Sequence, residues 1–404
     1  MIPRKRIDIG LRDITRGLIF CCASGDGARQ RAQIESAWSP RNNLACLSVR
    51  SGFDAFLTAL ALPHGAEVLM SAVNIADMAR VIQAHGLVAV PVDIDMRTLQ
   101  VPVQHLARAA TPRTRAVLIA HLFGSRMLLQ GVAEFCNKNK YLLIEDAAQA
   151  YTGDGWRGEP LADVSLFSFG PVKPATALGG AVLSFRDASL CACVRDTMAH
   201  WPLQSRAGYA MRLAKYAALA PFAHRWVYGA LVLVCRWCGT THDGLVSGAA
   251  RGFSGGEFFR RIRQRPSLPL LRLMQLRIAQ GVQASATLRV RNAQRLQSLL
   301  GGCCVGDAAA DHAHWIFPIV HADPDGLIRR LAARGFDATR QASSLGVLTP
   351  PPGSPAAAEA QRTFAQLVYL PAHEAMNERD IERLAAAVVA FVPRARSAAR
   401  PSPA

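Results

Sequence analysis

Long hydrophobic runs are missing from this sequence of 404 residues. Its most apolar stretch, Leu213–Cys238, contains four cationic or histidine positions and a proline, and its longest uncharged run is only Trp226–Cys235. A helix needs about 20 apolar residues to cross a bilayer, so no membrane span is expected here. The basic start, Met1–Arg6, is followed by charged positions, so no secretory signal is expected either.

Acidic residues are scarce, with 29 Asp and Glu against 46 Lys and Arg, which gives a formal net charge of +17. Such an excess favours anionic partners, namely phosphorylated small molecules, acidic membrane surfaces or nucleic acid. Aromatic residues make up only 7% of the chain and do not alternate with basic residues in a recognisable module. We therefore expect no nucleic-acid partner.

A disulfide framework is also missing, although the chain has ten cysteines. Most of them form local pairs, and Cys46 and Cys136 stand alone. Cys235 and Cys238 have the spacing of a zinc ligand pair with His242 nearby, but the second pair is missing, so no metal is predicted. Unpaired thiols are typical of a reducing compartment, and we expect a cytoplasmic protein.

Short apolar strands alternate with helices over about residues 44–186. We predict strands at Leu44–Val49, Val68–Met70, Val88–Val92, Ala116–Ala120 and Tyr141–Ile144, with a helix after the first at Phe53–Ala61. Continuous apolar strands separated by helices indicate an α/β fold with a mostly parallel sheet that is covered on both faces. Ligands bind such sheets at the carboxyl ends of the strands.

The rest of the chain predicts a modular organisation. An N-terminal arm (1–40) precedes the large domain (41–200), and a basic, hydrophobic helical insertion with a linker follows (201–265). A long helix over about 270–300 opens a small C-terminal α+β domain (266–392). The arm is expected to be peripheral, and the Pro/Ser/Ala/Arg tail (393–404) is expected to be disordered.

Two polar residues follow apolar strands at the expected ligand edge. Asp146 ends one strand, where a carboxylate can accept a hydrogen bond from a protonated ring nitrogen. Lys173 lies between Pro171 and Pro174, in a stiff turn just after the strand that carries Ser168. A lysine desolvated in a cleft is a competent nucleophile. Taken alone, each residue has an ordinary interpretation, the first as a helix cap and the second as a surface lysine.

A third element is the junction Ser51-Gly52-Phe53 between a strand and a helix. The amides at a helix N-terminus bind phosphate, and glycine lets the backbone approach a ligand closely. By itself such a junction is a weak signal.

The three elements occur together in an order that resembles the DegT/StrS-type sugar aminotransferases, which are fold-type I pyridoxal-phosphate (PLP) enzymes. The resemblance is close over about 44–186 and looser over about 315–391. Its most specific parts are Ile144-Glu-Asp-Ala-Ala-Gln-Ala150 and Phe167-Ser-Phe-Gly-Pro-Val-Lys173. His121-Leu-Phe-Gly124 and Leu370-Pro-Ala-His373 also contribute.

The resemblance implies a role for each matched residue. Lys173 carries PLP as a Schiff base and moves the proton during transfer, Asp146 pairs with the pyridine nitrogen, and Gln149 lies near the ring hydroxyl. The phosphate is held by Ser168 and the junction Ser51, Gly52 and Phe53. The implied reaction takes an amino group from a donor, usually glutamate, to a keto acceptor, most often a nucleotide-linked keto sugar. A homodimer is implied, because active sites in this family lie between subunits.

Two departures from the family pattern concern contacts to the cofactor. Ile75 stands where an aromatic residue usually covers the ring. The segment that reaches the neighbouring subunit's phosphate has no clear counterpart, and it aligns near Arg261–Arg265. An arginine there is our hypothesis for a replacement contact.

Residues 209–238 allow more than one interpretation of the keto acceptor and of the surface that this segment contacts. Their mixture of aromatic, apolar and basic residues is compatible with a peripheral membrane contact, and then with a lipid or other natural-product ketone as acceptor. The pattern favours the alternative of a core or dimer-contact helix, because an apolar, aromatic helical stretch is more often buried in protein. A third alternative is a non-catalytic PLP-fold binding protein, against which the retained Lys173, Asp146, Gln149 and Ser168 argue.

Overall fold

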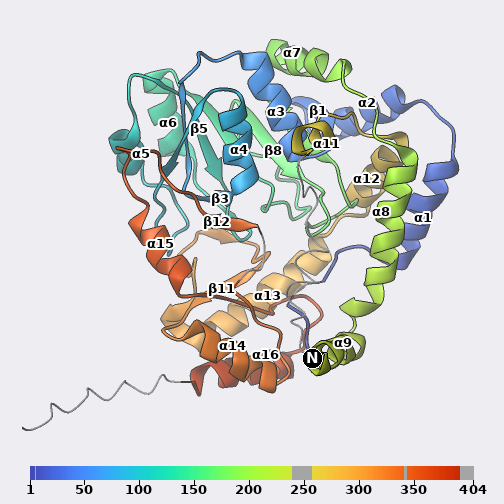
Figure 1. The fold of residues 1–404 in the computed structure, drawn as a ribbon, viewed down its shortest axis with the longest axis vertical. Helices are drawn as coiled ribbons and strands as arrows, with labels where there is room; N and C mark the ends of the chain where they lie inside the picture. Colours follow the sequence, from blue (N-terminus) through green and yellow to red (C-terminus); the bar gives the residue numbers. More distant parts are fainter. Residues whose placement is uncertain (5, 239–256, 341–343, 392–404) are drawn as a thin grey trace, which may run out of the picture.

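The computed structural model describes residues 1–4, 6–238, 257–340 and 344–391. Its centre is a seven-stranded sheet in the order β1-β9-β8-β7-β5-β2-β4 (Figure 1). Only β9 runs antiparallel to its neighbours, so the prediction of a mostly parallel sheet is confirmed. The strands are β1 (Asn42–Cys46), β2 (Glu67–Ser71), β4 (Val88–Val92), β5 (Thr114–Ala120), β7 (Leu142–Asp146), β8 (Val164–Ser168) and β9 (Ala181–Phe185).

Helices cover both faces of this sheet because the strands are apolar on both sides. One face packs against a group of four helices that shares its apolar core: α3 (Val49–Leu60), α4 (Ala76–Ala84), α7 (Ala188–Ala199) and α11 (Phe258–Ile262). The other face packs against two groups of helices. These are α5 (Val103–Ala109), α6 (Gln130–Asn139) and α15 (Ala358–Ala365), and then α1 (Leu11–Cys22), α2 (Gly27–Trp38), α8 (Arg206–Leu219) and α12 (Leu268–Gln280). Burial of both faces explains the continuous apolar strands of the sequence.

A smaller α+β unit follows toward the C-terminus, below the sheet in Figure 1. Its apolar core is shared by two strands and three helices. These elements are β11 (Phe317–Val320), β13 (Leu367–Leu370), α13 (Gln283–Leu300), α14 (Pro324–Ala333) and α16 (Glu378–Val389). Four short strands form two further pairs, β3 (Val73–Ile75) with β12 (Leu345–Val347), and β6 (Ser125–Arg126) with β10 (Asp311–His312).

The prediction of one long helix over 270–300 is wrong. The chain forms two helices instead, α12 and α13, which are separated at Gly281 and Val282. Gly281 has a φ of 68°, a conformation that favours glycine and ends a helix. The break changes the direction of the chain, so α12 packs on the sheet domain and α13 belongs to the small unit.

The expectation of a peripheral N-terminal arm is also wrong. Ile14 of α1 and Ile34 of α2 are buried in the core of the sheet domain. The Trp38 ring lies against Phe167 and Phe169, with ring centres 5.1 and 5.7 Å away, and its indole nitrogen donates to Ser184. The arm is therefore a structural layer. The predicted linker Gly244–Gly256 and the predicted disordered tail lie outside the described residues.

The 201–238 segment forms three helical pieces on the side of the molecule. These are α8, the short η1 (Ala220–Ala223) and α9 (Arg225–Trp237). Among the described residues no single helix is long and apolar enough to cross a membrane. A bent pair, Arg206–Ala223 with Arg225–Cys235 at 96°, passes the same test of length and composition when its two parts are taken together.

Candidate active site

The carboxyl ends of three strands bring the predicted site residues to one edge of the sheet. β7 and β8 are parallel, and β1 runs in the same direction because β9 is antiparallel to both β1 and β8. Asp146 ends β7, Ser168 ends β8, and the chain after β1 leads directly into α3. The edge is therefore the one at which ligands bind in such sheets.

Lys173 lies in the turn that follows β8, and two contacts fix this turn. Its own amide donates to the Gly170 carbonyl oxygen at 3.0 Å, and the Ala175 amide donates to the Asp8 carboxylate at 2.6 Å. Its amine nitrogen Nζ lies 4.0 Å from the centre of the Trp315 ring. Burial lowers the pKa of Lys173 to about 7, although the charge of Asp146 acts in the opposite direction. A large share of the amine is then unprotonated at neutral pH, which is the form that attacks an aldehyde.

Asp146 is almost buried, with 8% of its surface exposed. Its Oδ1 accepts a hydrogen bond from the Ala148 amide at 3.0 Å, whereas Oδ2 has no hydrogen-bond partner among the described residues. Burial raises the pKa of this carboxyl, and the Ala148 amide and the charge of Lys173 oppose the shift. An oxygen in such a position can accept a hydrogen bond from a cationic ring nitrogen.

Gln149 is held close to Asp146 by the backbone of the loop after β5. Its Oε1 accepts a hydrogen bond from the Phe123 amide at 3.0 Å, which leaves its side-chain nitrogen as a donor. Next to it, His121 and Glu145 form a buried pair with Nε2 and Oε1 2.8 Å apart. Nδ1 of His121 accepts from the Met127 amide, so the ring proton lies on Nε2 and is donated to Glu145. The pair joins the ends of β5 and β7 beside Asp146. Both residues lie in stretches that carry the resemblance, but the sequence did not predict that they form a pair.

Ser168 lies beside the lysine turn. Its Oγ accepts a hydrogen bond from the Gly170 amide at 3.3 Å. A Cβ atom at Gly170 would lie 3.4 Å from this Oγ and 4.0 Å from Cγ of Lys173. The hydroxyl and the lysine stem are therefore neighbours, and the role of Ser168 in holding phosphate stays a prediction.

The junction Ser51-Gly52-Phe53 differs from the prediction in its local structure. The helix starts at Val49, before the predicted Phe53, because the Ser48 side chain caps it by accepting from the Ser51 amide at 3.1 Å. The Gly52 amide already donates to the Ser48 carbonyl oxygen at 3.0 Å. Glycine is needed at position 52 because a Cβ there would lie 2.5 Å from a Leu183 methyl group. Its role in holding phosphate stays a prediction, and so do those of Ser51 and the buried Phe53.

Arg50, in the first turn of α3, is a cation of this site that the sequence did not reveal. Its Nε lies 2.6 Å from an Asp77 carboxylate oxygen. Its charge contributes to lowering the pKa of both Lys173 and Asp146, so it is within electrostatic reach of the two central residues.

Two positions depart from the family pattern, Ile75 and the arginines near Arg261–Arg265. Ile75 ends β3, is partly buried, and is paired with Leu345 of β12. Its position over a cofactor ring stays a prediction. Arg263 binds Asp54 of its own chain through two hydrogen bonds of 2.8 and 3.0 Å, and Arg265 donates to the Trp201 carbonyl oxygen. These two arginines are therefore engaged within the subunit, and the contact to a neighbouring phosphate also stays a prediction.

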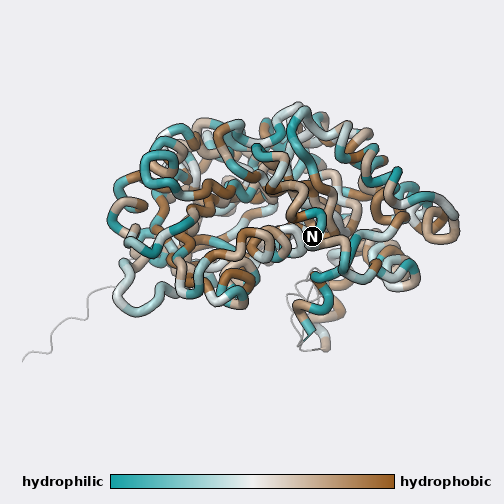
Figure 2. The backbone as a smooth tube through the Cα atoms, turned by 90° about the horizontal axis from the view of Figure 1, so that it is seen from above, coloured by the Kyte–Doolittle hydropathy of each residue, from teal (hydrophilic) through white to brown (hydrophobic). Residues whose placement is uncertain are grey.

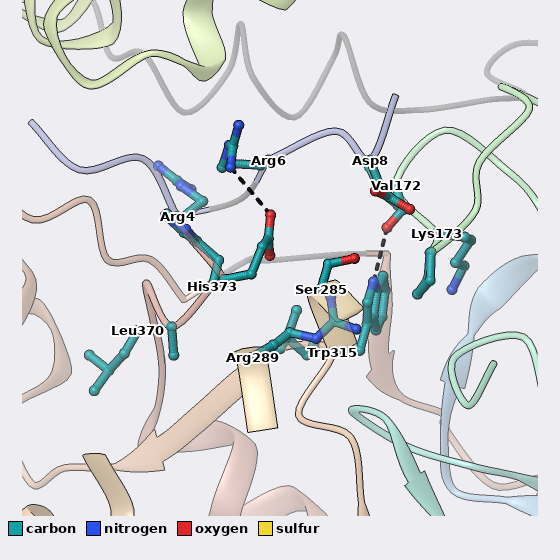
Figure 3. A pocket seen from close by; sticks show the side chains of 14 residues that line it. Arg4, Arg6, Asp8, Val172, Lys173, Ser285, Arg289, Trp315, Leu370 and His373 are labelled. Atoms are coloured by element: carbon teal, nitrogen blue, oxygen red, sulfur yellow. Dashed lines mark hydrogen bonds and ion pairs between the residues drawn. The ribbon is translucent and has the colours of Figure 1, made fainter. Parts of the chain in front are cut away.

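A pocket opens beside Lys173, between the sheet domain and the small unit (Figure 3). Of the predicted site residues only Lys173 lines it. The N-terminal segment, α13 and the loop after β13 supply the other polar side chains, which are Arg4, Arg6, Asp8, Ser285, Arg289, His373 and Glu374. His373 was singled out by the resemblance, whereas the N-terminal residues and Arg289 had no local signal in the sequence.

Residues 40–219 match the DegT/DnrJ/EryC1/StrS aminotransferase family. The match covers less than half of the chain. The chain is 30% identical over 158 residues to GDP-perosamine synthase of Caulobacter vibrioides. This match covers 38% of this chain and 42% of the relative. It is 32% identical over 162 residues to UDP-2-acetamido-2-deoxy-3-oxo-D-glucuronate aminotransferase of Pseudomonas aeruginosa, covering 38% and 45%. The chain thus spans about two-fifths of the length of the curated relatives it matches.

The family's fold extends over nearly the whole chain. The aminotransferase TlmJ from Streptoalloteichus hindustanus aligns with a TM-score of 0.67 at 20% identity, covering 96% of this chain and 98% of the other. A DegT DnrJ EryC1 StrS aminotransferase from Brucella abortus aligns with a TM-score of 0.68 at 17% identity, covering 95% and 96%. At these identities the likeness concerns the fold, which is that of fold-type I.

Proposed function

We propose that this chain is a PLP-dependent aminotransferase that moves an amino group, from glutamate as donor, to a nucleotide-linked keto sugar. The observation that carries the proposal is the buried amine of Lys173 within electrostatic reach of Asp146, at the ligand edge of this fold. Relatives named for GDP- and UDP-linked sugars support the acceptor class, as does the net charge of +17. A cytoplasmic homodimer is part of the proposal, supported by the free cysteines of the described chain and by the family resemblance.

The residues present fit the cofactor. When bound, PLP supplies an aldehyde carbon for a lysine amine and a ring that withdraws electrons from a substrate carbon. The Lys173 amine is partly unprotonated at neutral pH, Oδ2 of Asp146 would accept from the ring nitrogen, and the side-chain nitrogen of Gln149 would donate to the ring hydroxyl. Ser168 and the first turn of α3, with Arg50, would hold the phosphate.

Each side chain of the site then has its own role in amino transfer. Lys173 would hold the cofactor, and its free amine would take the proton from the donor α-carbon as general base. Asp146 would favour a protonated ring nitrogen, and the ring would then stabilise negative charge on that carbon. His121 and Glu145 fix the strand ends on which Asp146 depends.

The test is a half-reaction with the purified, PLP-loaded protein. L-glutamate is expected to remove the visible band of the lysine-bound cofactor and to release 2-oxoglutarate. Nucleotide-linked keto sugars are then expected to restore the band and to yield an aminated product in the mass spectrum. Loading without any donor reaction would contradict the proposal and favour a binding protein. Turnover with lipid ketones alone would contradict the sugar acceptor.

A specific observation supports peripheral contact with an anionic membrane, which we propose as well. The outer face of α9 exposes Trp226 (75%), Leu233 (67%), Val234 (55%) and Trp237 (89%), while Tyr228 faces inward. Figure 2 shows this part of the chain projecting from the body of the molecule. Exposed His224 and Arg225 lie at the start of α9, and exposed Lys215 lies on the preceding α8, so apolar anchors and cations occur in neighbouring parts of the segment. Such a combination binds anionic lipid surfaces.

Replacement of both tryptophans, Trp226→Ala with Trp237→Ala, is expected to reduce binding to vesicles that contain phosphatidylglycerol by about tenfold or more. The reason is that burial of such a side chain contributes about 1.5–3 kcal/mol, and 1.4 kcal/mol is a factor of about ten. Co-sedimentation measures the bound fraction. Leu128→Ala, an equally exposed apolar side chain on another surface, is the control and is expected to change nothing. Loss of a dimer in the double variant, with vesicle binding unchanged, would show that a second copy covers this helix.

A further inference from the structure

Three arginines line the pocket beside Lys173, and two of them are neutralised by the chain itself. Arg4 forms a buried pair with Asp337, with a nitrogen–oxygen distance of 2.7 Å. Arg6 pairs with Glu374 at 3.4 Å, as the dashed line in Figure 3 shows. The third is Arg289 of α13, and its position is different.

Arg289 has a fixed side chain but no counter-ion in the described part of the chain. Its Nε donates to the Ala313 carbonyl oxygen at 3.2 Å, which fixes the plane of the guanidinium. The two terminal nitrogens form no hydrogen bond with a described residue, and no carboxylate of these residues lies within 4.0 Å. In Figure 3 the guanidinium lies beside Ser285 and Trp315, inside the pocket.

The nearest carboxylates are already engaged. Asp8 lies 3.4 Å from Arg277 and accepts from the Ala175 amide. Glu374 is the partner of Arg6. Their charges reach Arg289 only over a longer distance, and burial lowers the pKa of its guanidinium. A partly buried cation without a close anion is unfavourable, so the pocket is electrostatically prepared for an anionic ligand.

The rest of the pocket indicates what kind of anion fits. The neighbouring His314 is neutral, because burial, together with the charge of Arg289, lowers its pKa to about 4. Arg289 therefore acts as a single guanidinium fork, which matches the two oxygens of one carboxylate. Trp315 connects this fork to the reactive turn: its indole nitrogen donates to the Val172 carbonyl oxygen at 2.9 Å, and its ring lies against the Lys173 amine.

We propose that Arg289 binds a carboxylate of the amino donor and thereby holds the donor's amine and α-carbon at Lys173. The inference rests on the proposed function and adds to it a residue for donor recognition. Since an acceptor diphosphate is also an anion, the two sources have to be separated by experiment.

The experiment measures ligand binding to the PLP-loaded protein by calorimetry, with glutarate as the carboxylate probe and UDP as the diphosphate probe. Arg289→Met is expected to weaken glutarate binding by about 10–100-fold, the range expected for hydrogen bonds to a charged group. UDP binding and cofactor loading are expected to stay unchanged. Arg289→Lys keeps the charge without the fork, and its affinity for glutarate is expected to lie between those of the wild type and Arg289→Met.

Arg295→Met is the matched control, because it removes an arginine from the same helix whose side chain is 48% exposed and paired with Glu382. It is expected to bind glutarate like the wild type. Unchanged glutarate binding in Arg289→Met would overturn the inference, and so would a loss confined to UDP. If the wild-type protein neither holds PLP nor reacts with any donor, the proposed function itself fails, which is a different result. Circular dichroism and the thermal midpoint show that each variant is folded.

Discussion

Replacement of Lys173 by alanine is expected to abolish covalent attachment of the cofactor and to lower the rate of amino transfer by at least about 10³-fold. The amine is both the attachment point and the proton carrier, and general acid–base catalysis alone contributes about 10²–10⁴-fold. Burial lowers its pKa to about 7, so no exposed lysine is an equal substitute at neutral pH. Borohydride reduction followed by peptide mass spectrometry checks attachment, and the half-reaction checks the rate.

Lys138→Ala on the surface of α6 is the control for this variant. The side chain of Lys138 is exposed, and it lies just before the start of β7, whereas Asp146 and the ligand edge lie at the other end of that strand. It is expected to trap the cofactor at residue 173 as the wild type does. A reduced cofactor adduct recovered from Lys173→Ala would show that another amine forms the linkage, and the assignment of this residue would be wrong.

Replacement of Asp337 by alanine is expected to lower the free energy of unfolding by about 3–5 kcal/mol, the usual cost of removing one partner of a buried ion pair. The Arg4 guanidinium binds both oxygens of this carboxylate at 2.7 Å, and both side chains are at most 5% exposed. The Tyr228 hydroxyl donates to the same group at 2.5 Å. The variant therefore removes the carboxylate to which a buried cation and a buried hydroxyl donate. Chemical denaturation monitored by circular dichroism measures the loss.

Glu382→Ala is the control for Asp337→Ala. It breaks the Arg295–Glu382 pair, whose side chains are 48% and 52% exposed, and is expected to change the stability by at most about 1 kcal/mol. Similar small changes in both variants would contradict a special role for the buried pair at Arg4.

The sheet could be predicted from the sequence because its strands carry a strong local signal. Val88–Val92 was placed at its observed bounds, since an apolar, β-branched run is followed at once by acidic residues. The start of α3 was misplaced because Ser48 acts as a cap, and a serine after an apolar run does not by itself distinguish a cap from a strand end. The break at Gly281 was missed for a related reason, since a single glycine within a helical pattern is often tolerated.

The catalytic edge and the pocket differ in how far they were predictable. Asp146, Ser168 and Lys173 lie within a short stretch of chain and follow strands, so their meeting point follows from the direction of the strands. Arg4, Arg289 and Trp315 come from three distant segments. Their meeting depends on how the small unit and the N-terminal segment pack on the sheet domain, and no local pattern encodes it.

The N-terminal arm failed as a prediction for a similar reason. Its sequence is polar enough to look like a surface extension, yet Ile14, Ile34 and Trp38 each fill a space left by the rest of the fold. A few large apolar side chains in a basic segment are sufficient to make a structural layer, and composition alone does not reveal which ones are used.

Trp315 gives the molecule an internal optical reporter. Its indole ring lies within van der Waals reach of the Lys173 amine, at 4.0 Å, whereas the chain's other five tryptophans are not part of the described pocket. A chromophore joined to that amine and absorbing at the wavelengths of indole emission quenches Trp315 more strongly than more distant indoles, because energy transfer falls steeply with distance. Occupancy of the lysine is therefore readable as a change in intrinsic fluorescence, without a label and at protein concentrations too low for an absorbance band.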